Sequence, residues 1–235
     1  MVLLAWLALA AAGFVALGVW QLERRVWKLD LIAQVDARVH AHAVAPPAPP
    51  DWPTVSAADD QYRRVQVRGV FLHDRETLTQ AATALGAGYW VLTPLRTDQG
   101  FTVLINRGFV SPERRDSASR ADGQVGGEQT VTGLLRITEP KGGFLRANDP
   151  ANDRWRSRDV EAIAQARGLG DVAPYFIDAE AGPDPSAWPR GGLTVIRFPN
   201  SHLVYALTWF GMALLSLGGM VLVLRERRRR EPPAS

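Results

Sequence analysis

The sequence predicts a membrane protein in which two terminal transmembrane α-helices flank a mainly antiparallel β domain, barrel- or sandwich-like, with one or two helices. This prediction rests on three observations: uncharged apolar runs near both ends, short runs of alternating polarity between them, and an arginine-rich C-terminal end. The expected order is a transmembrane helix at 1–21, a helical extension and proline-rich linker at 22–50, a β-rich domain at 51–200, a second transmembrane helix at 201–224, and a basic tail at 225–235.

The two apolar runs are long enough to cross a bilayer. Residues 2–20 and 203–224 contain no charge, and a helix rising about 1.5 Å per residue needs roughly 20 residues to span the hydrocarbon layer. A cleaved signal peptide, with Ala8-Leu9-Ala10 as the recognition site, is the alternative for the first run. In either case the domain between the runs is exported.

Charge at the ends of the runs predicts the orientation. Aromatic residues mark one edge of the second run and the arginines of the tail follow the other, as in a helix whose C-terminus stays inside. Both termini are therefore expected in the cytoplasm and the large domain in the periplasm, with the protein in the cell inner membrane. Arg24, Arg25 and Lys28, just after the first run, favour the opposite orientation, but a long translocated domain counts little in this rule.

Small residues recur at helical spacing in both runs. Ala8, Ala12 and Ala16 in the first, and Gly211 and Gly218 in the second, would let two helices approach closely. Generic apolar sequence explains the same pattern equally well, so both interpretations stay open.

The segment between the runs contains one extended helix and many strands. Apolar spacing predicts that the first helix continues through 21–45 and that the prolines at 46–50 end it in an extended linker. A helix is expected at Asp159–Arg167, with Asp159 as N-cap and Gly168 beyond its end. A hairpin turn is expected at 97–100. The predicted strands are 62–71, 77–80, 89–96, 101–110, 130–138, 154–158, 174–178 and 193–198.

Composition excludes several classes of function. The net charge of +3 equals that of residues 225–231 alone, so the basic charge is a terminal cluster rather than a stripe that would bind nucleic acid. The absence of cysteine excludes thiolate metal sites, disulfides and covalent haem attachment. Motifs of acyl transfer, metallohydrolysis or phosphate binding are also missing, so we do not expect an enzyme.

His202 is the candidate ligand. Tyr205 and Trp209 follow it at i+3 and i+7, which places an imidazole above aromatic rings on one helix face at the outer membrane edge. Imidazole is a common axial ligand of haem iron, although a polar residue that anchors a helix gives the same pattern. Arg197, shortly before, would pair with a haem propionate or with a lipid phosphate.

Several segments, taken together, resemble the Surfeit locus protein 1 family of cytochrome c oxidase assembly factors. They cover nearly the whole chain: 17–24 (LGVWQLER) with Trp27-Lys28, 67–71 (VRGVF), 93–95 (TPL), 103–110 (VLINRGFV), 133–136 (GLLR), 148–150 (NDP) before Trp155, and 200–210 (NSHLVYALTWF). Phe109 stands where the family usually has Trp. The basic residues that members commonly carry before the first span are missing, which favours a start placed too far downstream.

The resemblance implies a role in maturing the oxidase's catalytic subunit, together with other assembly factors. It also implies transient binding and delivery of haem a, with His202 at the family's haem-linked histidine and iron ligand, and Tyr205, Trp209 and Arg197 around the macrocycle. The alternative is a membrane scaffold that binds no cofactor and stabilises assembly intermediates. The expected partners are the catalytic subunit of cytochrome c oxidase, other assembly factors, haem a and the lipid bilayer.

Overall fold

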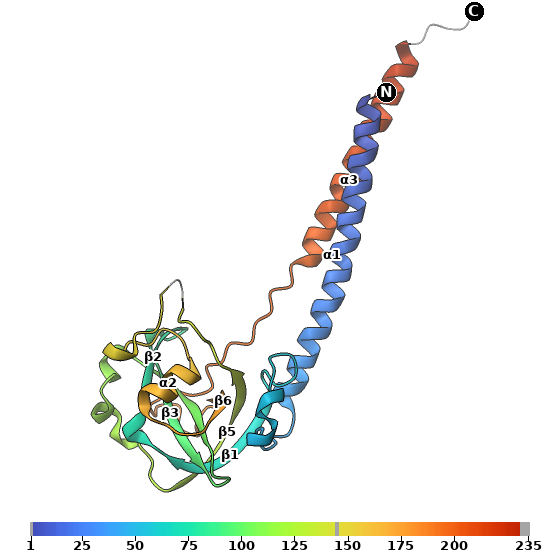
Figure 1. The fold of residues 1–235 in the computed structure, drawn as a ribbon. Coiled ribbons are helices and arrows are strands. Elements are labelled where there is room, and N and C mark those ends of the chain that lie inside the picture. The colour runs from blue at the N-terminus through green and yellow to red at the C-terminus, as the bar shows by residue number, and fades with distance from the viewer. Residues whose placement is uncertain (1, 144–145, 231–235) are drawn as a thin grey trace, which may run out of the picture. The chain divides into compact units, whose positions relative to one another are not determined.

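The computed structural model describes residues 2–143 and 146–230, which form two compact units (Figure 1). One unit combines residues 1–34 with 197–235, and the other spans 35–196. The helices are α1 (Val2–His40), α2 (Val160–Arg167) and α3 (His202–Arg230); the strands are β1 (Arg64–Phe71), β2 (Thr77–Thr83), β3 (Gly86–Thr97), β4 (Thr102–Val110), β5 (Glu128–Ile137) and β6 (Val172–Ala179).

The six strands form one sheet that closes on itself. Its order is β1-β5-β6-β4-β3-β2, and a further pairing of β1 with β3 joins five of the strands into a ring. Among these six strands, only β4 and β6 pair in parallel. Gly69 lies at the closure, opposite Thr97, where a Cβ atom would overlap the carbonyl oxygen of Arg96. A residue without a side chain is therefore needed where the ring closes.

Alternation along the strands builds two apolar layers. Val103 and Ile105 of β4 point into the barrel, whereas Leu104 points out against α2. Tyr175 and Ile177 of β6 face inward in the same way. Successive side chains of a strand point to opposite faces, so strands that are apolar at every position have both faces covered. This is why the parallel pair lies between the barrel interior and α2.

The predicted helix inside the domain is confirmed. The Asp159 side chain accepts a hydrogen bond from the backbone N–H of Ala162 at 3.2 Å, and Gly168 adopts the left-handed conformation beyond the C-terminus. The hairpin predicted at 97–100 is also present, with Gly100 at positive φ. Both features follow from local chemistry that the sequence displays.

Two predicted strands are wrong. Residues 193–198 form no strand, because β6 already pairs with β4 on one side and β5 on the other, leaving no edge to extend. Residues 154–158 make only isolated bridges. There the side-chain oxygen of Asn148 accepts the backbone N–H groups of Arg156 and Ser157, so side-chain bonds replace a strand ladder.

The proline-rich segment lies against the barrel. Helix α1 ends at His40, earlier than the predicted extension through 45, and residues Pro49–Thr54 form a short 3₁₀ helix rather than extended chain throughout. The Tyr175 hydroxyl donates to the carbonyl oxygen of Pro47 at 2.6 Å, and Trp52 contacts Phe101 edge to face. These contacts fasten the segment to the core.

Helices α1 and α3 have the length and apolar character of membrane spans. Only 11% and 6% of their most apolar windows are buried, which is unlike the core helix of a soluble protein. Figure 1 shows the two helices side by side and antiparallel, and Leu7 lies near Gly219 while Phe14 contacts Trp209. The two apolar helices thus support a membrane protein, as the sequence predicts. Met1 and residues 231–235 of the predicted basic tail lie outside the described residues.

Candidate functional site

His202 lies at the start of α3 and contacts α1 through a single polar bond. Its Nδ1 atom is 2.8 Å from the side-chain oxygen of Gln21. Because an amide oxygen only accepts hydrogen bonds, Nδ1 must carry the proton. Nε2 has no hydrogen-bond partner within the described part of the chain, so this tautomer leaves the Nε2 lone pair available to a metal.

The helix pair that holds this bond packs with heptad-like spacing. On α1 the least exposed positions of the middle section are Ala11, Phe14, Gly18 and Gln21; on α3 they include His202, Ala206, Trp209 and Ala213. Ala206 is fully buried. Alternating steps of three and four residues keep one seam of each helix facing the other. The imidazole therefore sits at the end of an apolar seam, on a rigid element.

One glycine sets how closely the helices meet. A Cβ atom on Gly18 would stand 2.5 Å from the ring of Phe210. The predicted small residues do not serve this purpose: Ala8, Ala12 and Ala16 are all exposed, and no atom lies within 4 Å of a Cβ built on Gly211 or Gly218. The spacing was right for close helices, but the contact face is rotated away from those positions.

The predicted site residues differ in their surroundings. Trp209 stacks on Phe14, with ring centroids 5.7 Å apart and planes inclined by 22°. Tyr205 leaves the seam and is 55% exposed. Arg197, before α3, is exposed, and no described residue hydrogen-bonds or pairs with its guanidinium. The structure thus joins His202 and Trp209 to the seam, with Tyr205 beside it.

Two contributors to the site were not predicted. Gln21 is the first polar residue after the uncharged run, which is the only signal by which the sequence marks it. Asn200, two residues before His202, has a buried side-chain oxygen that no described residue hydrogen-bonds. Buried polar atoms normally have a partner, so Asn200 offers an unused acceptor two residues before His202. One imidazole, one orphan acceptor and aromatic rings suit a flat apolar macrocycle with polar edges better than a bare metal ion. The described residues contain no group of three or more His, Cys, Asp or Glu side chains that could hold a metal ion.

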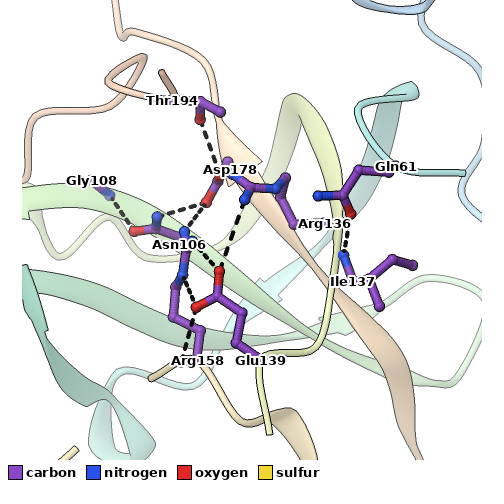
Figure 2. A network of polar contacts seen from close by, with 9 residues as sticks. All are labelled: Gln61, Asn106, Gly108, Arg136, Ile137, Glu139, Arg158, Asp178 and Thr194. Carbon is purple, nitrogen blue, oxygen red and sulfur yellow. Dashed lines mark hydrogen bonds and ion pairs between the residues drawn. The ribbon is translucent and has the colours of Figure 1, made fainter. Parts of the chain in front are cut away.

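The β-rich unit contains a buried ion network around Asp178 (Figure 2). One carboxylate oxygen accepts from Asn106 at 2.7 Å and Arg158 at 3.1 Å; the other accepts from Arg136 at 2.6 Å and Thr194 at 3.0 Å. The network links β4, β5 and β6 to the chain after β6. All four acceptor positions of the carboxylate are used, so it has no lone pair free to act as a base.

Arg158 is held charged within the network. Burial alone would lower the pKa of Arg158, but its hydrogen bond to Glu139 and the charge of Asp178 outweigh burial and raise the pKa above the usual value. The Arg158 guanidinium also lies 4.6 Å from the ring centroid of Phe176. The two arginines of the network, Arg136 and Arg158, and its two carboxylates, Glu139 and Asp178, together carry no net charge. The network lines one side of a cavity of about 420 Å³, in which its charges are already paired with one another.

Comparison with known proteins bears directly on these features. A model of the SURF1 family matches residues 8–214. The chain belongs to this family. It is 36% identical over 214 residues to Surfeit locus protein 1 of Homo sapiens, covering 84% of this chain and 69% of that protein. It is 36% identical over 223 residues to the Mus musculus protein (88% and 71%) and 34% identical over 227 residues to a SURF1-like protein of Monosiga brevicollis (91% and 84%).

The segments that first suggested the SURF1 family meet in the structure. Residues 17–24 contribute Gly18 and Gln21, and residues 200–210 contribute His202 and Phe210, which are their contact partners. The SURF1-family segment 103–110 supplies Asn106 to the ion network. Its Gly108 adopts a φ of 129°, and a Cβ atom there would overlap the backbone of Arg190, so the backbone requires a glycine at this position.

Proposed function

We propose that this protein is an assembly factor for cytochrome c oxidase that binds haem a through His202 and helps deliver it to the catalytic subunit. Membership of the SURF1 family implies the role in oxidase assembly, and a family of assembly factors suggests a chain that is not itself an enzyme. The binding and delivery of haem a are our proposal. The observation that supports them is the bond between Gln21 and His202.

The proposed site uses residues of the helix pair. A haem group would supply an iron centre that takes one axial imidazole. Gln21 fixes the tautomer that presents Nε2, and the packed seam restricts rotation of the ring. Trp209 and Tyr205 offer aromatic surface to an apolar macrocycle, and Arg197 offers a guanidinium to a propionate. The open Nε2 and the exposed Arg197 agree with a ligand that is bound transiently and passed on.

The location in the cell follows from charge. We place the protein in the inner membrane with both termini in the cytoplasm and the β-rich domain in the periplasm, because arginines follow the apolar run of α3 and form its C-terminal end. The chain lacks cysteine, so the single variants Asp98→Cys and Arg228→Cys each report on one side. In spheroplasts a membrane-impermeant maleimide should label the Asp98→Cys variant and spare the Arg228→Cys variant. The reverse pattern would invert the topology.

Spectroscopy tests haem binding. Protein purified from cells that make haem a should show a Soret band, and His202→Ala should reduce it by at least about tenfold, since the axial ligand is lost. The matched control is His40→Ala, which removes an exposed histidine bonded only within its own helix turn. An unchanged band in the His202 variant would discard ligation by this residue. If neither the wild type nor the His202 variant carries haem, and the variant still co-purifies with the oxidase subunit, the cofactor-free scaffold replaces our proposal.

A further inference from the structure

Strand β2 ends the sheet and has a partly free outer edge. The backbone N–H of Gln80 points outward and donates to the carbonyl oxygen of Trp155 at 2.9 Å. Outward and inward hydrogen-bonding groups alternate along a strand, so the N–H and C=O of Ala82 also point outward. No described residue pairs with them. Unpaired edge groups of this kind are a template for another strand.

A hollow follows this edge. It measures about 690 Å³ and is lined by Gln80, Ala81 and Ala82 of β2. Ala87 and Gly88 of β3, which have small or no side chains, also line it. A second hollow of about 310 Å³ adjoins it and shares three lining residues, Gln80, Tyr89 and Arg156. Small side chains thus leave room for a segment of extended chain.

The two hollows are bordered by unpaired positive charge. Four arginines line them, and none forms an ion pair within the described part of the chain; we name Arg115, Arg146, Arg154 and Arg156 the arginine rim. The one lining carboxylate, Asp153, is already bound by Arg167 at 2.5 Å and by the Trp155 indole at 2.7 Å. The rim therefore has uncompensated charge, and guanidinium groups bind carboxylates in forked geometry.

We propose that the β2 edge and the arginine rim together bind an acidic, extended segment of a partner protein, which adds as a strand beside Ala82. The edge supplies backbone hydrogen bonds, and the rim selects glutamate or aspartate at alternate positions, because alternate side chains of a strand face the same side. Anionic lipid headgroups would satisfy the arginines but not the backbone groups of Ala82. The combination of the two features favours a peptide over a membrane surface.

A synthetic strand tests the proposal on the full chain in phosphatidylcholine nanodiscs. The probe is a fluorescein-labelled peptide, Glu-Val-Glu-Val-Glu-Val-Glu, measured by anisotropy. We expect saturable binding that Ala82→Pro weakens at least about tenfold, since proline removes the outward N–H and leaves the bonds to β3 in place. The double variant R146A/R156A should weaken binding to a similar degree. The matched control is Arg96→Ala, an exposed arginine outside the hollows, which should bind as wild type.

Three results would overturn the proposal. The first is an absence of saturable binding at millimolar peptide. The second is binding that survives Ala82→Pro while R146A/R156A abolishes it, which would mean charge attraction without strand addition. The third is binding of phosphatidylglycerol vesicles through the rim arginines without binding of the peptide, which would assign the surface to lipid. Unchanged circular dichroism and melting temperature of each variant ensure that lost binding reflects the surface and not the fold.

Discussion

Replacing Asp178 with Asn should destabilise the β-rich unit strongly. Asp178 is 4% exposed and accepts four hydrogen bonds, two of them from arginines. The asparagine side chain has the same shape but only one accepting oxygen, so its NH₂ group would face two of the donors that the Asp178 carboxylate now accepts. Removing one member of a buried, hydrogen-bonded ion pair typically costs about 3–5 kcal/mol. Against a usual total of roughly 5–15 kcal/mol, Asp178→Asn should remove about a fifth or more of the stability.

Guanidinium denaturation of the full chain in detergent, followed by tryptophan fluorescence, measures this effect. The control is Asp98→Asn in the exposed β3–β4 turn, which should change the free energy of unfolding by less than about 0.5 kcal/mol. Adding Arg158→Met to the Asp178 variant removes a buried charge left without its partner, so the double variant should lose less than the sum of the two single ones. A loss below about 1 kcal/mol for Asp178→Asn, or simple additivity, would refute the view that the network holds the barrel strands together.

Three further predictions concern the helix pair and the core. Gln21→Leu removes the acceptor for the Nδ1 proton of His202 and about 1 kcal/mol of preference for that tautomer. The imidazole ¹⁵N chemical shifts of His202 should then move toward those of a mixture of the two tautomers. Unchanged shifts would contradict the assigned bond. In Gly18→Leu the new side chain would overlap the Phe210 ring, so the distance between spin labels on α1 and α3 should increase by about 1–2 Å. Gly13 faces open space, so Gly13→Leu should leave that distance unchanged. Burial raises the pKa of the Tyr175 phenol. The unfolded chain therefore releases that proton at a lower pH than the folded protein, so the free energy of unfolding falls as pH rises above about 10. In alkaline thermal melts, Tyr175→Phe should make this fall less steep. An equally steep fall in the variant would exclude Tyr175 as its source.

The sequence was informative where structure depends on neighbours along the chain. The cap at Asp159 and the glycine at 168 define α2 locally, and the strand expected at 62–71 is present as β1, with Val65 and Val67 in the core. The strand expected at 193–198 failed because strand formation also needs a free edge, and both edges of β6 are occupied by strands from elsewhere in the sequence. Such competition has no local signature.

The candidate site was predictable only in part. His202 and Trp209 were found by their spacing on one helix, and the structure does bring both to the seam. Gln21 could not be paired with His202, because the rotation of one helix against another depends on packing across the whole seam; Ala8, Ala12 and Ala16 have helical spacing too, yet all three are exposed. The Asp178 network was also hidden, since Asn106, Arg136 and Asp178 come from three separate strands and its other members come from the segments between elements.

The bond between Gln21 and His202 joins residues separated by 181 positions. During synthesis the segment that carries Gln21 is made first, and its partner is added only after every barrel strand has been synthesised. A chain that stops early, or that is cut between the two helices and separates, has no imidazole held against α1. Completion of the polypeptide is therefore built into the site, and an unfinished molecule cannot present the ligand that the finished one does.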